Sequence, residues 1–272
     1  MSSAPPSVIP TPAPVAASGP TADAAGPRLR VQALGPLHVQ VDGRSIDASA
    51  WGSARPRELL VYLLMHPDGR TKEQVGLEFW PDASAAQLRN NFHVTLHRLR
   101  KALGGSEWVT LEHDRYRIYP ELVDLDVERF DQETTAARRA LKRKTEGAAE
   151  QLEAALALYH GDFLDGEPVG DWHLEHRDAL QRLYVDASME LGAHLTGAER
   201  PAEAADVYRR VLARDELHEE ALRALMRTLA ESGERSQALR AYQRFADKLE
   251  KELEAEPEEE TVELMEELQG GG

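Results

Sequence analysis

Residues 84–104, SAAQLRNNFHVTLHRLRKALG, form the stretch that decides the fold. Ser84 and Gln87 have the spacing of a capping box, which opens a helix, and Gly104-Gly105 supplies a C-terminal stop. Between these signals, apolar residues recur three or four positions apart; they are Leu88, Phe92, Leu96, Leu99 and Leu103. This spacing predicts one long helix with a single apolar face.

The opposite face of this helix carries side chains that donate hydrogen bonds and one apolar residue. Since a helix fits the major groove, whose base edges differ for each base pair, we interpret this face as a DNA reader. The candidates for base edges or the thymine methyl group are Asn90, Val94, His97 and Arg98. Those for phosphates, on the flanks, are Arg89, Arg100 and Lys101, and His93 also lies on a flank. An ordinary surface helix would show a similar polar face, so the neighbouring elements decide between the two interpretations.

A small sheet and two helices are predicted before this helix. Alternating apolar residues begin at Leu29, and Asp42-Gly43 favours a tight hairpin turn. Helical spacing starts at Arg55 and ends at residues 66–69. A second capping box at residues 71–74 opens a short helix that Pro81 stops.

A second hairpin is predicted after the long helix, because residues 108–111 and 116–119 alternate around residues 112–115. Strands, three helices and a final hairpin describe an α+β winged helix-turn-helix over residues 28–120. Further DNA contacts are expected from Arg115, with His113, at the hairpin tip, and from Arg55 and Arg57 at the start of the first helix.

The charge of the chain is unevenly distributed. The net charge of −16 argues against DNA binding for the chain as a whole. Residues 28–119, however, hold 13 basic and 10 acidic residues, whereas residues 120–272 hold 19 basic and 37 acidic ones. We therefore expect a mildly basic DNA-facing part and an acidic part with another role.

The second part is residues 121–268, and from about Asp126 onward its pattern is typical of helices. Helices are predicted at residues 126–143, 147–159, 171–196, 201–213, 217–232, 235–252 and 258–268. Residues 204–208 recur at 238–242, an offset of 34 residues, and residues 155–159 have the same form. A period of 34 is typical of TPR repeats, in which small residues let paired helices approach and a tyrosine fills the groove. The pattern predicts an all-α, TPR-like domain.

Several other classes of protein are disfavoured. The chain has no cysteine, no apolar run of the roughly 18 residues that a membrane span needs, and no secretory signal. We therefore expect a cytoplasmic protein without a membrane partner. Residues 1–27 contain seven prolines and predict a disordered tail.

No enzymatic or metal site is predicted. His93 and His97 are four residues apart but lack the glutamate of a zincin helix, and His173, Glu175 and His176 lack a further ligand. The sequence shows neither a catalytic Ser/His/Asp arrangement nor a glycine-rich phosphate loop. We expect no catalysis and no cofactor.

Both parts of the chain resemble known domains. The matches in the first part are residues 34–37 (LGPL), 57–64 (RELLVYLL), 79–82 (FWPD) and 96–103 (LHRLRKAL). They resemble the OmpR/PhoB-type winged helix as used by SARP-type antibiotic regulators. The matches in the second part are residues 123–126 (VDLD) with Phe130, 159–164 (YHGDFL), and Trp172 with Arg177. They resemble the bacterial transcriptional activator domain (BTAD).

The resemblance implies an activator that binds direct repeats of double-stranded DNA near promoters as a side-by-side homodimer. It also implies contact with RNA polymerase holoenzyme through the loop between the second and third helices, which here is Trp80, Pro81, Asp82 and Ala83. One departure concerns the wing, where Arg115 stands at the position of the family's usual glycine.

Two alternatives remain open at this point. The acidic helical part could make the chain a protein-interaction adaptor whose winged helix does not bind DNA. It could instead hold a small molecule and act as a sensor.

Overall fold

A four-stranded sheet opens the fold in the computed structural model, which describes residues 29–270. The tail predicted at residues 1–27 lies outside this range. β1 (Leu29–Gln32) pairs antiparallel with β2 (His38–Val41), which pairs with β3 (Arg44–Ser45). The predicted turn at Asp42-Gly43 is confirmed, since both residues have positive φ between β2 and β3. β6 (Val123–Leu125) adds a parallel strand on the other side of β1.

Three helices follow β3, as the sequence predicts, and the first two pack against the third. They are α1 (Ala54–Leu64), α2 (Lys72–Phe79) and α3 (Ala85–Ala102), preceded by the 3-10 turn η1 (Ala48–Trp51). Both predicted capping boxes are present, and in each the cap hydroxyl and the glutamine amide bond to the other residue's backbone. The first residues of α2 and α3 could therefore be predicted from the local sequence.

The predicted wing is a hairpin of β4 (Thr110–Glu112) and β5 (Arg115–Arg117). His113 and Asp114 both have positive φ, so the two-residue turn is made without glycine. Arg70 and Tyr116 exchange backbone hydrogen bonds, which ties the connection between α1 and α2 to β5. The fold of residues 29–119 is a winged helix.

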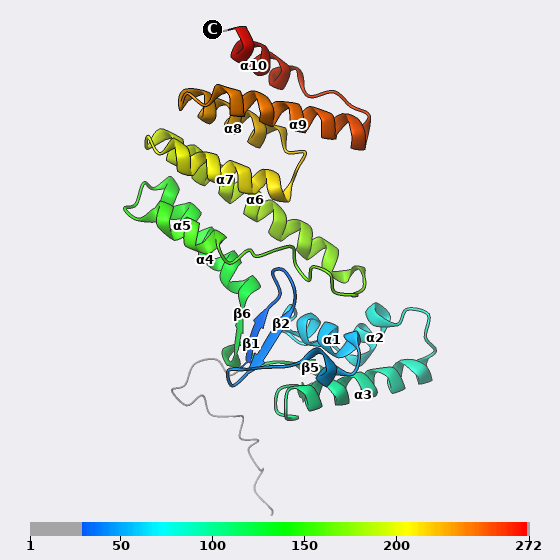
Figure 1. Cartoon of the computed structure of the whole chain (residues 1–272). Helices are drawn as coiled ribbons and strands as arrows, with labels where there is room; N and C mark the ends of the chain where they lie inside the picture. Colours follow the sequence, from blue (N-terminus) through cyan, green and yellow to red (C-terminus); the bar gives the residue numbers. More distant parts are fainter. Residues whose placement is uncertain (1–28, 271–272) are drawn as a thin grey trace, which may run out of the picture.

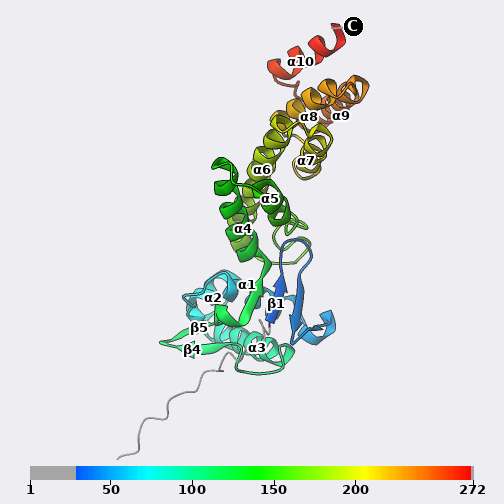
Figure 2. The same ribbon diagram turned by 90° about the vertical axis from the view of Figure 1, so that its left-hand side faces the viewer.

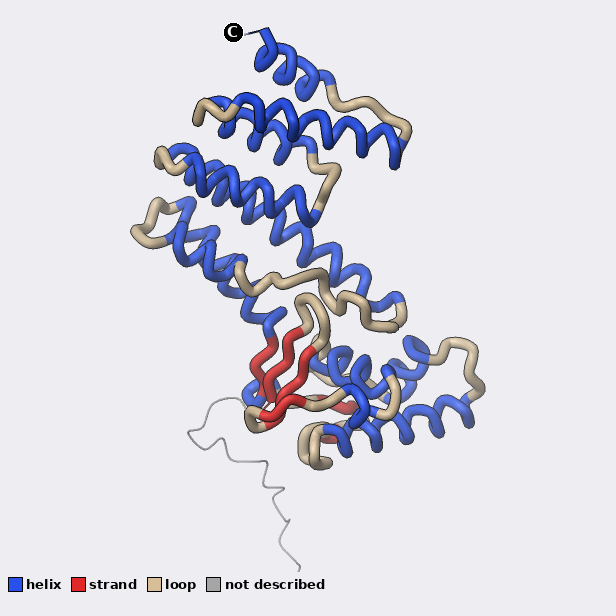
Figure 3. The backbone as a smooth tube through the Cα atoms, viewed as in Figure 1, coloured by secondary structure: helices blue, strands red, loops and turns tan. Residues whose placement is uncertain are grey.

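The rest of the chain is helical, and each helix packs against the next in sequence (Figure 1). After the turn η2 (Pro120–Leu122) come α4 (Asp126–Lys142), α5 (Ala148–Leu156), η3 (Asp171–His173), α6 (Leu174–Gly197), α7 (Pro201–Arg214), α8 (Glu219–Glu231), α9 (Arg235–Leu253) and α10 (Glu259–Gly270). Figure 3 shows these helices as a stack that begins above the sheet. All seven predicted helices are present with small shifts at their ends.

A close contact between α6 and α7 depends on one glycine. A Cβ added at Gly192 would lie 2.5 and 2.6 Å from the ring atoms Cε1 and Cζ of Tyr208, which is buried. The absence of a side chain at Gly192 therefore lets α6 approach the ring of Tyr208, whereas the sequence analysis considered only the alanines beside that tyrosine.

We expect Gly192→Ala to lower the free energy of unfolding by about 2 kcal/mol, because the added methyl group overpacks the helix contact. Gly197→Ala is the matched control on the same helix. A Cβ there meets nothing within 4 Å, so alanine should stabilise by up to about 1 kcal/mol through helix propensity. Urea denaturation of both variants tests the difference, and equal stabilities would contradict it.

The winged helix and the helical part meet at a junction that is held largely by hydrogen bonds of backbone groups. Asp126 accepts hydrogen bonds from the N–H groups of Ala33 and Leu34 at 2.8 and 2.9 Å. The backbones of residues 33–35 and 162–164 exchange further bonds, and Gly161 lies so close to Gly35 that a Cβ would fall 2.9 Å from its Cα. Burial raises the pKa of the Asp126 carboxyl, against the lowering effect of these N–H donors. The loop of residues 160–170 thus packs against the winged helix and forms most of this junction.

A buried carboxylate makes the second set of contacts at this junction. The side chain of Glu58 on α1 is 0% exposed and accepts bonds from the Gly170 N–H at 2.9 Å and the Trp172 indole N–H at 3.1 Å. Arg177 donates to the carbonyls of Phe163 and Leu164, which holds the loop in place. The residues that carried the resemblance to a BTAD therefore build the contact with the winged helix.

Candidate nucleic-acid interface

α3 is held by one face and leaves the other open. Phe92 and Leu99 are fully buried, and the ring of Phe92 packs on Tyr116 of the wing with centroids 4.7 Å apart. Val94, on the opposite side, is 42% exposed. Figures 1 and 2 both place α3 at the end of the molecule opposite α10. The helix is thus fixed to the fold and free to meet a partner.

Seven of the predicted DNA contacts share this exposed surface of α3. They are Arg89, Asn90, His93, Val94, His97, Arg98 and Lys101. The helix contains no acidic residue. Arg98 also reaches Ser53, whose hydroxyl lies 3.4 Å from its guanidinium. The open face therefore combines amide, imidazole and cationic donors with one apolar side chain.

Three predicted phosphate contacts lie elsewhere. Arg57 forms an ion pair with Glu167 at 3.0 Å, across the junction between the two parts. Arg100 donates to the carbonyl of Val109 at 2.7 Å, so it points toward the base of the wing. Arg55 pairs with the buried Glu58 and lies over the ring of Phe79. These three residues make contacts within the fold and do not lie on the exposed face of α3, and their role in DNA binding stays a prediction.

The wing tip offers two exposed residues, as predicted. Arg115 is exposed, although one of its guanidinium nitrogens donates to the carbonyl of Gly69 at 3.1 Å. His113 is exposed in the turn itself. Both lie at the projecting end of the β4–β5 hairpin, which Figure 2 shows beside α3.

A glycine that the sequence analysis did not single out sets the packing of α3. A Cβ added at Gly76 on α2 would lie 2.3 to 2.6 Å from side-chain carbons of Leu88. The two helices therefore approach too closely for any larger residue at that position. An isolated glycine inside a helical pattern was the available signal.

The loop between α2 and α3 presents a small surface of its own. Pro81 and Asp82 are exposed, and Trp80 is half-buried with its ring 5.7 Å from that of Phe79. The Ala83 N–H donates to the carbonyl of Trp80, which closes a turn. The segment that the resemblance assigned to polymerase contact is thus an ordered turn beside α3.

Two of the histidines considered as metal ligands, His173 and His176, have structural positions, whereas His93 and His97 lie on the exposed face of α3. His173 bonds through Nδ1 to the carbonyl of Gly170, and His176 packs edge-on against Trp172 and Phe163. Burial lowers the pKa of His176 and that of His66, whose ring lies 6.5 Å from it. These side chains form part of the junction.

The comparisons with known proteins agree with this architecture. The sequence profile of the bacterial transcriptional activator domain matches residues 125–269. The regulatory protein AfsR of Streptomyces griseus is 28% identical over 261 residues, and the match covers 91% of this chain and 25% of that protein. AfsR of Streptomyces coelicolor is 28% identical over 257 residues, and the match covers 88% of this chain and 24% of that protein. The chain thus spans about a quarter of the length of these curated relatives.

A solved structure shares the fold. It is that of Mycobacterium tuberculosis EmbR in complex with a low-affinity phosphopeptide. The TM-score is 0.69 at 23% identity, over 89% of this chain and 65% of that one.

Fold and matches together define the class as a winged helix followed by an activator-type helical domain. The chain belongs to the bacterial transcriptional activator domain family, and the prediction of a SARP-type transcriptional regulator is confirmed. This is a family of transcription regulators and not a class of enzymes. Among residues 29–270, no helix is long and apolar enough to cross a membrane.

Proposed function

We propose that this activator binds double-stranded DNA in a sequence-specific manner, with α3 in the major groove. The observation that carries the proposal is the open face of α3, because the opposite face is buried and no acidic residue interrupts the donors. Asn90, His97 and Arg98 can hydrogen-bond to base edges, and Val94 suits a thymine methyl group. The relatives named regulatory proteins support the same role.

The remaining cations of this surface suit the DNA backbone. Arg89 and Lys101 lie near the two ends of α3, and Arg115 projects from the wing. In this position they would contact phosphates on either side of the groove and orient the helix without reading sequence.

We further propose that two copies bind side by side on direct repeats and that residues 80–83 contact RNA polymerase holoenzyme. The exposed turn after Trp80 is available beside α3 for such a contact. We also propose that the helical part is a TPR-like array, because residues 204–208 recur after 34 residues and because Gly192 admits the ring of Tyr208. Its role would be dimerisation, regulation or contact with the polymerase. The protein would act in the cytoplasm.

Selection of bound sequences from a random pool of duplex DNA tests the proposal directly. The full chain should enrich one short motif, repeated at a fixed spacing if two copies bind together. A pool that remains random after several rounds would overturn sequence-specific binding. The adaptor alternative would gain from that result.

The salt dependence of binding gives a second test. Arg89→Ala and Lys101→Ala should each lower the slope of log K against log salt by about one, because each substitution removes a phosphate contact. Arg139→Ala on α4, an exposed cation of the helical part, is the control and should leave the slope unchanged. Fluorescence anisotropy with the selected duplex provides the measurement. If the slope of log K against log salt is the same for all three variants, Arg89 and Lys101 do not contact phosphates.

A further inference from the structure

A groove in the helical part lies well away from α3 in sequence and has a composition unlike its surroundings. It has a volume of about 370 Å³ and runs between α7 and α9 over α8. Leu222, Leu225 and Phe245 give it an apolar floor. A smaller hollow of about 110 Å³ continues it along α9 and shares Leu225 and Arg244 with it.

The rim of this groove is cationic in a part of the chain that is strongly acidic. The basic residues lining the two hollows are Arg209, Arg240, Arg244 and Lys248, and the one acidic residue among the lining is Glu216. Two of these cations are neutralised, since Arg209 pairs with Asp206 and Lys248 with Glu216 and Glu252. Arg240 and Arg244 are exposed, one helical turn apart, and form no ion pair with any residue in the described range 29–270.

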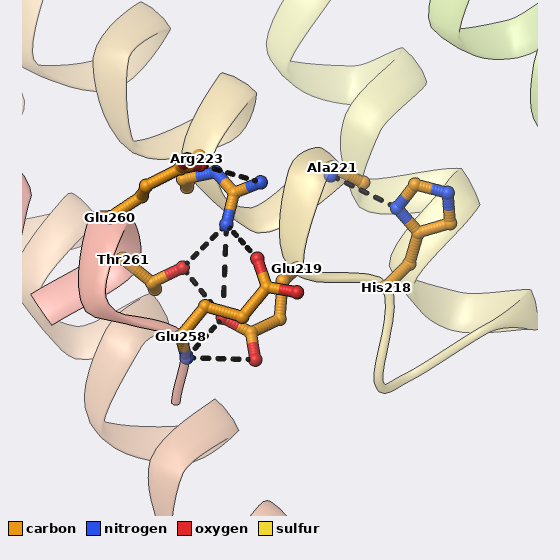
Figure 4. A network of polar contacts seen from close by, with 7 residues as sticks. All are labelled: His218, Glu219, Ala221, Arg223, Glu258, Glu260 and Thr261. Atoms are coloured by element: carbon orange, nitrogen blue, oxygen red, sulfur yellow. Dashed lines mark hydrogen bonds and ion pairs between the residues drawn. The ribbon is translucent and has the colours of Figure 1, made fainter. Parts of the chain in front are cut away.

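The chain itself shows which kind of segment this helical surface accepts. α10 begins with Glu259 and Glu260 and buries Thr261 and Leu264 as it packs on α8 and α9. Figure 4 shows how Arg223 of α8 holds it, with Glu258 at 2.7 Å and the hydroxyl of Thr261 at 2.9 Å. Arg223 on α8 thus binds the start of an acidic, amphipathic helix, which packs its apolar side chains against α8 and α9.

We propose that the groove between α7 and α9 is a docking site for an acidic, amphipathic segment of a partner protein. Apolar side chains of that segment would pack on Leu222, Leu225 and Phe245, and its carboxylates would pair with Arg240 and Arg244. The free cations supply charge complementarity, and the apolar floor supplies the desolvated core of the contact. This interaction is independent of DNA binding by α3.

A peptide selection on the full chain tests the docking site. The probe is a phage-displayed library of random 16-residue peptides, and the enriched peptides should carry net negative charge with apolar residues three or four positions apart. Binding of a labelled enriched peptide should weaken by roughly tenfold in the double variant Arg240→Ala/Arg244→Ala.

The double variant Arg139→Ala/Arg227→Ala is the matched control, because it removes two exposed cations outside the groove. It should bind the peptide as the parent chain does. Enrichment without an acidic bias, or equal weakening in both double variants, would overturn the proposal. Light scattering covers a further outcome: self-association that only the Arg240→Ala/Arg244→Ala variant loses would assign the groove to a second copy and also overturn it.

Discussion

Glu58→Ala is expected to lower the free energy of unfolding by about 3 kcal/mol, the largest effect of any single substitution considered. The carboxylate is completely buried and accepts hydrogen bonds from the Gly170 N–H and the Trp172 indole. Alanine leaves both partly buried donors without their acceptor, and Arg55 loses its partner. Because the Arg55 side chain is 40% exposed, water compensates part of that last loss. Urea denaturation followed by circular dichroism measures the change.

Two further variants separate the hydrogen bonds from the charge. Glu58→Gln keeps one carbonyl acceptor, so it should fall between the parent chain and Glu58→Ala. Glu121→Ala removes an exposed carboxylate from η2 and should leave stability within about 0.5 kcal/mol of the parent. If Glu58→Ala proves as mild as Glu121→Ala, the buried carboxylate does not hold the junction.

The position of the loss can also be measured. Since the Glu58 bonds cross from α1 to the loop before α6, their removal should expose the Gly170 amide first. Hydrogen exchange should therefore accelerate at residues 160–172 more than in α7 to α9. This result would show that the BTAD-type loop is anchored by the winged helix.

The elements of this fold were predictable because each carries its own signals. The capping boxes at Thr71 and Ser84, the apolar periodicity of α3 and the turn at Asp42-Gly43 all act over a few residues. Local rules were enough to place the ends of α2 and α3. The same holds for the helices that follow, whose apolar faces repeat at helical spacing.

The junction could not be predicted from such rules. The parallel pairing of β6 with β1 and the bonds from Glu58 to Gly170 and Trp172 join residues about a hundred positions apart. Each contact depends on one side chain or one strand of three residues, which leaves no periodic pattern. Gly161 illustrates the difficulty, because only its approach to the Gly35 backbone shows why a side chain is excluded there.

For the candidate site, the sequence predicts the exposed face of α3 but not the contacts that nearby arginines make within the fold. A helical wheel separates the buried and open faces of α3 correctly, because that separation depends only on the period of the helix. It cannot show that Arg100 finds the carbonyl of Val109, or that Arg57 meets Glu167 from another part of the chain. Flanking cations are therefore the least predictable members of such a surface.

The second large effect concerns Val94, at the centre of the open face of α3. We expect Val94→Asp to weaken binding to the selected duplex by about 100-fold, because the new carboxylate would lie against base-edge acceptors and phosphates. The fold should tolerate it, since Val94 is 42% exposed and valine and aspartate have similar helix propensities.

Leu253→Asp at the end of α9 is the matched control for this prediction. It is 60% exposed and introduces the same charge far along the chain from α3, so it reports the effect of net charge alone. Its affinity should stay within about twofold of the parent chain, because a distant exposed charge is screened by salt. The affinities are measured by fluorescence anisotropy on variants whose melting temperatures are equal. Equal affinities of the two variants would show that α3 does not enter the major groove of the DNA.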